Sequence, residues 1–207
     1  MNHISQNFNS PLRIDDILDA QFSGDIERAH GLYIEYFEAN EIDFSKLNLF
    51  AICCMQLGKV EKAEKLFEAV IENAPNINEA FIHLSDLKVQ NGDLEGALEV
   101  LDREAAVANG DRLFQIQKAK VLFSLGYYSQ ALKHIETAYE QGEQCADTLL
   151  LYARIENELG NQDKSLSLIK KLMFFHPENT DGLLLQAHWH LKQENWEAAV
   201  ADTKIIT

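Results

Sequence analysis

The chain contains 207 residues, 46% of them hydrophobic, so it is long enough to bury a core without disulfides or metals. A formal net charge of −15 disfavours binding to nucleic acids or anionic membranes. The simplest interpretation of this charge is a solvated acidic surface that keeps the protein in solution. The polar first ten residues, and the lack of an apolar run near the roughly 20 residues of a membrane span, predict a cytoplasmic protein without membrane insertion.

A 34-residue period runs through the sequence. Each period has a glycine, a small residue five positions later and a larger apolar residue nine positions later. The glycine lets the backbone turn between two helices, the small residue lets those helices cross closely, and the bulky residue fills the space beside the crossing. The pattern therefore predicts an all-α protein of helix–turn–helix units. Its members are Gly24, Gly58, Gly92, Gly126 and Gly160; Ala29, Ala63, Ala97, Ala131, Ser165 and Ala199; and Tyr33, Phe67, Leu101, Ile135 and Ile169.

In chain order, we predict a polar leader over residues 1–9 and then one domain over residues 10–207. The first repeat begins at Ser10 and Pro11, which are a good N-cap and first-turn pair, but it has Arg13 and Asp16 where apolar residues are expected. A polar first repeat suits the end of a stack, which faces water on one side. In the last repeat Glu194 occupies the glycine position. The six repeats span residues 10–43, 44–77, 78–111, 112–145, 146–179 and, truncated, 180–207.

The last helix, expected from about Asn195 to Thr207, carries several apolar residues: Trp196, Val200, Ile205 and Ile206. The sequence stops before a polar helix that would cover them. We expect either that this chain is part of a longer protein or that its last helix packs against another subunit, as in a homodimer.

The segment Phe44–Pro75 carries a resemblance to a known family. Its Leu47, Phe50, Ala51, Gly58, Ala63, Phe67 and closing Pro75 stand in the register of the tetratricopeptide repeat, and the resemblance extends from Ser10 to Thr207. It implies a right-handed α-solenoid whose first helices line a concave groove that binds peptides. The lysine, asparagine and arginine set with which co-chaperones of this family hold a C-terminal carboxylate is absent, as is the asparagine ladder of the related O-linked sugar transferases.

The stripe that would line this groove is more apolar than a solvated helix face. We predict apolar anchors at Ile52, Met55, Val89 and Phe123, and polar residues that fix the register of the ligand. Lys120 and Arg154 occupy one position in successive repeats, and either bind a ligand carboxylate or neutralise acidic residues nearby, namely Asp86, Asp147 and Glu158. Ile82, Ile116, Leu150 and Leu184 either join the groove or are buried between repeats. The predicted groove residues are Asn48, Leu49, Ile52, Met55, His83, Asp86, Val89, Gln117, Lys120, Phe123, Arg154, Asn157 and His188.

Signatures of catalysis are lacking. His188 and His190 lie two positions apart on a helix and point away from each other, so they cannot share a metal ion. The three cysteines, Cys53, Cys54 and Cys145, are a poor disulfide framework and suit a reducing compartment. No phosphate-binding loop, zinc-protease motif or nucleophile elbow occurs.

We therefore expect no catalytic residue, no cofactor and no metal. The predicted function is a non-catalytic scaffold that binds a partly apolar peptide or partner helix in its groove. The alternative is the N-terminal docking arm of a larger enzyme, such as a glycosyltransferase or sulfotransferase, whose catalytic domain lies outside this chain.

Overall fold

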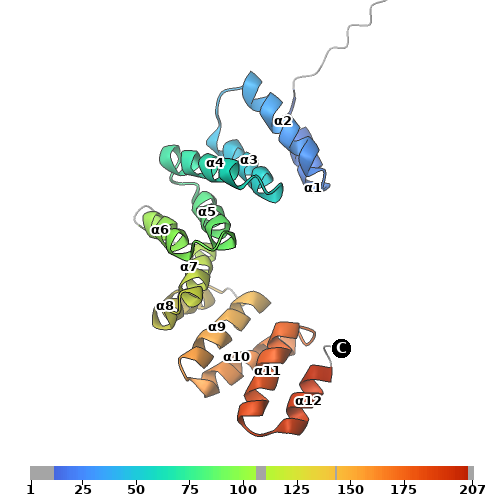
Figure 1. The fold of residues 1–207 in the computed structure, drawn as a ribbon, viewed down its shortest axis with the longest axis vertical. Helices are drawn as coiled ribbons and strands as arrows, with labels where there is room; N and C mark the ends of the chain where they lie inside the picture. The colour runs from blue at the N-terminus through green and yellow to red at the C-terminus, as the bar shows by residue number, and fades with distance from the viewer. Residues whose placement is uncertain (1–11, 106–110, 143, 205–207) are drawn as a thin grey trace, which may run out of the picture. The chain divides into compact units, whose positions relative to one another are not determined.

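The computed structural model describes residues 12–105, 111–142 and 144–204, and within them it contains twelve α-helices and no strand (Figure 1). The chain divides into two compact units, Met1–Asn91 and Gly92–Thr207. Unit 1 contains α1–α5 and unit 2 contains α6–α12. The helices are α1 Ile14–Phe22, α2 Ile26–Ala39, α3 Phe44–Gln56, α4 Val60–Asn73, α5 Asn78–Gln90, α6 Leu94–Ala105, α7 Arg112–Ser124, α8 Tyr128–Glu140, α9 Ala146–Glu158, α10 Gln162–Phe175, α11 Thr180–Lys192 and α12 Trp196–Lys204.

The predicted glycines form the turns between paired helices. Gly58, between α3 and α4, has φ = 67°, a left-handed conformation that a residue with a side chain adopts only with strain. Its N–H donates to the carbonyl of Met55 at 2.9 Å, and the N–H of Lys59 donates to that of Cys54 at 2.9 Å. These two bonds satisfy the last carbonyls of α3 while the chain reverses direction. The prediction of a glycine turn is confirmed.

The small residues of the repeat are buried, as predicted. The members of the series from Ala29 to Ala199 are between 0% and 3% exposed, and their bulky companions from Tyr33 to Ile169 are at most 1% exposed. Ser165 is the polar member of the series, and its hydroxyl donates to the carbonyl of Ala153 on the facing helix at 2.8 Å. The position therefore tolerates a hydroxyl because a carbonyl of the neighbouring helix lies within reach.

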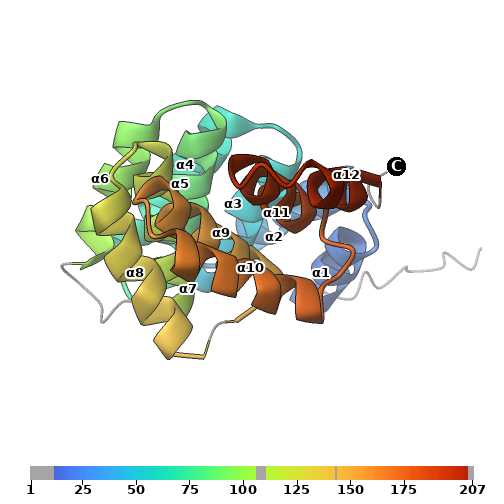
Figure 2. The same ribbon diagram turned by 90° about the horizontal axis from the view of Figure 1, so that it is seen from below.

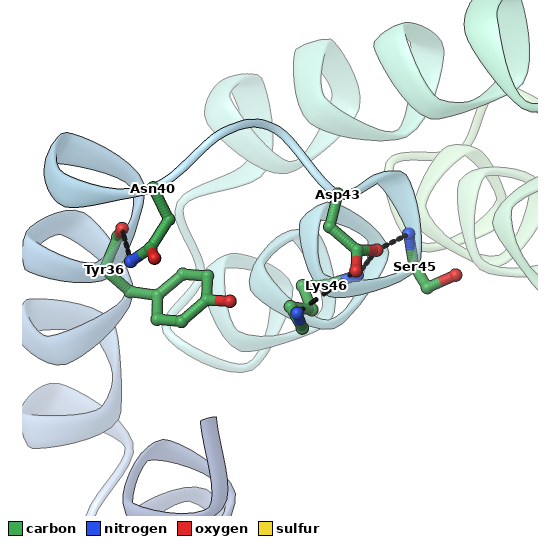
Figure 3. A network of polar contacts seen from close by, with 5 residues as sticks. All are labelled: Tyr36, Asn40, Asp43, Ser45 and Lys46. Carbon is green, nitrogen blue, oxygen red and sulfur yellow. Dashed lines mark hydrogen bonds and ion pairs between the residues drawn. The ribbon is translucent and has the colours of Figure 1, made fainter. Parts of the chain in front are cut away.

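In unit 1, α1 packs on α2 and α3 packs on α4, while α5 contacts both α3 and α4. The connection from α2 to α3 is fixed by local polar contacts (Figure 3). Asn40 donates to the carbonyl of Tyr36 at 2.8 Å, and the Asp43 carboxylate accepts from the backbone N–H groups of Ser45 and Lys46 at 3.0 and 3.3 Å. The Lys46 ammonium lies 3.1 Å from the same carboxylate. Asp43 is therefore the N-cap of α3.

In unit 2, the pairs α7/α8, α9/α10 and α11/α12 lie side by side, and α10 packs against α11 (Figures 1 and 2). The first helices of successive pairs also touch, since α9 contacts both α7 and α11. Helix α9 is the most completely buried, with Leu149, Ala153 and Ile155 all 0% exposed. The side of unit 2 formed by α7, α9 and α11 is thus continuous across three repeats.

The first helix differs from the prediction. It begins at Ile14 and not at Ser10 or Pro11, because Leu12 and Arg13 are not helical. Arg13 is the N-cap, and its N–H donates to the Asp16 carboxylate at 3.3 Å. The two polar residues that looked misplaced in a packing helix therefore cap its beginning.

At the other end of the chain, α12 spans Trp196–Lys204. The leader 1–9, Ser10, Pro11, Ile205 and Ile206 lie outside the described residues. Continuity of one solenoid over residues 10–207 stays a prediction.

Candidate functional site

The candidate site is a hollow of about 310 Å³ between α7 and α9 of unit 2. Three of the predicted groove residues, Lys120, Phe123 and Arg154, line it together. Its lining residues are Lys120, Phe123 and Ser124 from α7, and Asp147, Leu150, Leu151 and Arg154 from α9.

Helical periodicity explains why these residues meet. Lys120 and Phe123 are three positions apart, and so are Asp147 and Leu150, while Arg154 follows Leu150 by four; such spacings place side chains on one face of a helix. The opposite face of α9 is occupied by core residues. The helices therefore need no special local geometry to present the hollow.

Two cationic side chains stand at the hollow. The Arg154 guanidinium lies 3.5 Å from the Asp181 carboxylate of α11, and both side chains are about half exposed, at 42% and 56%. An ion pair this long and this exposed contributes little to stability, so Arg154 is free to bind another carboxylate. Lys120 is exposed and forms no ion pair with any residue that the structure describes. The hollow thus offers two cationic groups to a ligand, beside the Asp147 carboxylate that also lines it and the Asp181 carboxylate that faces Arg154.

The floor of the hollow is apolar. Leu150 and Leu151 are each 8% exposed, and the half-buried Phe123 ring contacts Tyr128 of α8 with centroids 5.5 Å apart. Farther along the same side, Leu184 is 50% exposed and Leu191 is 42% exposed on α11. A floor of large apolar groups beside two cations suits a ligand that has both apolar and acidic groups.

Four residues, Ile82, Ile116, Leu150 and Leu184, were expected either to join the groove or to be buried between repeats, and they differ in exposure. Ile116 and Leu150 are buried, Ile82 is half-buried and Leu184 is half-exposed. Ile116 and Leu150 are therefore buried between repeats, whereas the equivalent Leu184 on α11 is accessible.

The predicted groove residues of unit 1 are Asn48, Leu49, Ile52, Met55, His83, Asp86 and Val89. Ile52 and Met55 on α3 and the three residues on α5 are half-buried, and α3 contacts α5. The His83 ring stacks on Phe67 of α4, with centroids 5.8 Å apart. Burial lowers the pKa of His83, against a smaller opposing effect of Asp86 and Glu79, so this ring is held as a neutral packing group.

Two predicted groove residues are buried, although a groove position was expected to be accessible. Asn48 on α3 is 6% exposed and Gln117 on α7 is 5% exposed. Leu49 beside Asn48 is half-buried. Neither amide is placed to contact a ligand without rearrangement, because neighbouring helices cover both.

The remaining predicted residues of unit 2, Asn157 and His188, do not line the hollow. Asn157 is half-buried and donates to the Glu158 carboxylate at 3.4 Å, and His188 is exposed on α11. The ring of Trp189 meets that of His190 edge-on at 5.1 Å. Ser124 lines the hollow but was missed by the sequence; its spacing of four from Lys120 was the available signal.

The cysteines also have different surroundings. Cys53 and Cys54 on α3 are fully buried and Cys145 is exposed. Burial raises the pKa of the Cys53 thiol to about 11 and also raises that of Cys54. Both buried thiols therefore stay protonated at neutral pH.

The described part of the chain lacks two kinds of feature. No helix there is long and apolar enough to cross a membrane. No group of three His, Cys, Asp or Glu residues within it is arranged to hold a metal ion.

Solved structures of low sequence identity share this fold. YrrB, described as a TPR protein with an unusual peptide-binding site, has a TM-score of 0.69 at 17% identity, over 84% of this chain and 89% of its own. MamA from Desulfovibrio magneticus RS-1 has a TM-score of 0.71 at 18% identity, over 81% and 96%. The thermophilic TPR protein TTC0263 from Thermus thermophilus has a TM-score of 0.63 at 22% identity, over 86% and 95%. These likenesses show the fold.

No curated protein sequence matches the chain. The family model described as tetratricopeptide repeat matches residues 54–111 and 116–180, which is more than half of the chain. The sequence period, the paired helices with their glycine turns and this match agree. The chain belongs to the tetratricopeptide repeat family.

Proposed function

We propose that this protein is a non-catalytic scaffold that binds a segment of another protein along α7, α9 and α11. The observation that carries the proposal is the hollow in which Lys120 and Arg154 stand beside Phe123, Leu150 and Leu151. The peptide-binding site named for YrrB, a protein of the same fold, supports this kind of ligand.

The lining defines the ligand more closely. A carboxylate of the bound segment contacts Lys120 and replaces Asp181 as the ion-pair partner of Arg154. An apolar side chain of the segment packs on Phe123. Asp147 also lines the hollow and repels a second acidic residue next to the first. The segment therefore combines an isolated acidic residue with apolar neighbours.

The size of the hollow requires further contacts. A volume of about 310 Å³ is at the small end for a ligand site and accommodates only a few side chains. The exposed Leu184 and Leu191 on α11 continue the apolar surface. We place the remainder of the bound segment along them.

Selection of binders from a random peptide library tests this function. We expect the selected peptides to share an acidic residue beside apolar ones. Their affinity for Lys120→Glu/Arg154→Glu, measured by calorimetry, should fall by about tenfold or more, because two favourable charge contacts become repulsive. Phe123→Ala should weaken binding without a change of charge.

The matched control is Lys164→Glu/Lys170→Glu, which makes the same change of charge at exposed positions on α10. Equal affinity of the selected peptides for the wild type and the Lys120/Arg154 variant would refute the proposed site. Circular dichroism checks that each variant is folded.

Self-association through α12 is a second candidate. Trp196 is 63% exposed and Val200 is 51% exposed, whereas Ala199 on the same helix is buried. Trp196 and Val200 are four positions apart and share one face of the helix, and a contiguous exposed apolar patch marks an interaction surface. Sedimentation at several concentrations tests the candidate: a dimer that Trp196→Glu abolishes supports it, and a monomer at every concentration contradicts it.

A further inference from the structure

Three nitrogen-bearing side chains converge in unit 1. The Lys59 ammonium lies 3.0 Å from Nε2 and 3.4 Å from Nδ1 of His30, and the Lys62 ammonium lies 3.4 Å from the same Nε2. His30 comes from α2, Lys59 from the turn after α3 and Lys62 from the first turn of α4. The cluster therefore joins two successive repeats.

Packing against Phe50 positions two of the three groups, His30 and Lys62. His30 is only 9% exposed, and its ring lies against Phe50 with centroids 5.4 Å apart. The Lys62 ammonium sits over the Phe50 ring at 4.6 Å from its centroid. Phe50 thus holds both the imidazole and one ammonium in place.

The two ammonium groups of this arrangement have no ion-pair partner among the described residues, although the Glu61 carboxylate lines the same turn. A neutral imidazole nitrogen has a single lone pair, so Nε2 accepts a hydrogen bond from one lysine and leaves the other unsatisfied. Among the residues that the structure describes, no carboxylate forms an ion pair with Lys59 or Lys62. Two like charges at one nitrogen repel each other unless an anion lies between them.

The exposed side of the cluster is open. A hollow of about 410 Å³ lies at this turn and is lined by Gly58, Lys59, Val60, Glu61 and Lys62. The buried His30 contacts both of these lysines but does not itself line the hollow. A comparable hollow of about 520 Å³ lies at the Gly160–Lys164 turn, where Asn161 takes the place of Lys59. The hollow is therefore a feature of the repeat, and the paired lysines with the buried histidine are particular to this turn.

The sequence also shows that the pair of lysines occurs at this turn in one repeat only. The positions one and four residues after each repeat glycine hold Asp25 and Arg28, Lys59 and Lys62, Asp93 and Gly96, Tyr127 and Gln130, and Asn161 and Lys164. Cations occupy both positions only in the second repeat. A requirement of the fold does not explain this pair, because the other repeats form the turn without it.

We propose that Lys59, Lys62 and His30 form a binding site for a phosphoryl dianion. Its two negative charges balance the two ammonium groups, and its tetrahedral oxygens accept from three donors that approach from different directions. A carboxylate has one negative charge and balances only one of the two ammonium groups. The net charge of −15 keeps anionic membranes and nucleic acids away, so the ligand is a small phosphate or a phosphorylated side chain of a partner.

The histidine contributes as a neutral group. Burial first, and then the charges of Lys59 and Lys62, lower the pKa of His30. The ring therefore adds no third positive charge to the cluster. When an oxyanion is bound, the tautomer with hydrogen on Nε2 donates to it while the lysines turn to the other oxygens.

Calorimetric titration with inorganic phosphate, at constant ionic strength in chloride, tests the proposal. We expect one equivalent of phosphate per chain, with affinity reduced by about tenfold or more in Lys59→Gln/Lys62→Gln. His30→Phe keeps a ring against Phe50 but removes a donor, and should weaken binding to a smaller extent.

The matched control, Lys65→Gln/Lys164→Gln, removes two exposed lysines outside the cluster and should leave phosphate binding unchanged. Circular dichroism checks the fold of each variant. Absence of saturable binding to the wild type, or equal binding by the Lys59/Lys62 variant, would overturn the proposal.

A second arm identifies the source of the phosphoryl group. The same titration with a short phosphoserine peptide gives tighter binding than inorganic phosphate if the natural ligand is a phosphorylated partner, and equal or weaker binding if it is a free phosphate. In both cases the Lys59→Gln/Lys62→Gln variant must bind the titrated ligand more weakly than the wild type does. The site in unit 1 uses none of the residues of the α7–α9 hollow, so failure of one proposal leaves the other standing.

Discussion

Replacement of Glu194 by glycine should stabilise the last repeat. Glu194 has φ = 59°, the left-handed conformation that the other repeats give to glycine, and it forms the same turn. Its N–H donates to Leu191 at 3.1 Å, and the N–H of Asn195 donates to His190 at 2.9 Å. Since these bonds belong to the backbone, the Glu194→Gly variant retains them.

The magnitude follows from two opposing terms. The left-handed conformation costs a residue with a side chain roughly 1–2 kcal/mol, whereas glycine loses roughly 0.5–1 kcal/mol more chain entropy on folding. Taken at the midpoints of these ranges, the difference is a net stabilisation of about 0.75 kcal/mol. In a repeat protein this gain is local, so opening of α11 and α12 should become about 2- to 5-fold rarer.

Hydrogen exchange of the amides of α11 and α12 measures that opening directly. Glu194→Ala is the control, because alanine keeps the left-handed strain but removes the carboxylate from the carboxyl end of α11, where a negative charge is unfavourable. The backbone argument is refuted if the alanine variant slows exchange as much as the glycine variant, or if glycine leaves exchange unchanged.

Three further predictions concern the core. A thiol reagent at pH 8 should modify Cys145 in the native protein and reach Cys53 and Cys54 only on unfolding; rapid reaction of a second thiol contradicts this. Ala131→Leu should reduce the free energy of unfolding by about 1–3 kcal/mol or more, since it forces a large group between two helices at a 0% exposed position; an unchanged melting temperature counts against close packing there. The pKa of His83 is lower in the folded than in the unfolded state. The stability that the neutral His83 ring contributes is therefore complete above the unfolded-state pKa, and it is lost as the pH falls toward the folded-state pKa. The difference in melting temperature between wild type and His83→Gln should therefore shrink from pH 7.5 to pH 5.5, and a constant difference would exclude the effect.

The sequence predicted the parts of the fold that depend on volume and chain reversal. Ala131 and Gly58 are each constrained by one physical requirement, a close helix crossing and a left-handed turn, so their periodic occurrence was sufficient. The start of the first helix was predicted wrongly because Ser10–Pro11 is itself a good capping signal, and Arg13 with Asp16 supplies a second one three residues later. One sequence alone does not show which of two adequate capping signals begins the helix.

Some of the predicted groove residues lie together at one hollow, and others are buried. Lys120 and Arg154 share one position in successive repeats, and helical geometry alone brings both to the hollow. Asn48 and Gln117 lie at the edge of the same stripe, where contact with the neighbouring helices buries them. The repeat register fixes which way a side chain points, whereas its exposure depends on how closely the next repeat approaches.

The pairing of Arg154 with Asp181 was also beyond the sequence. That contact joins two repeats through long, partly exposed side chains. Their rotamers follow from the three-dimensional surroundings and not from the spacing of the two residues along the chain.

Both tryptophans of the protein lie in the last repeat, Trp189 within α11 and Trp196 at the start of α12, on either side of the Glu194 turn. Intrinsic tryptophan emission is consequently a built-in spectroscopic reporter of that repeat alone. The tyrosines, which are absent from α11 and α12, report on the rest of the chain. If the repeats melt one after another, the tryptophan and tyrosine signals change at different temperatures, and no attached label is needed to detect this.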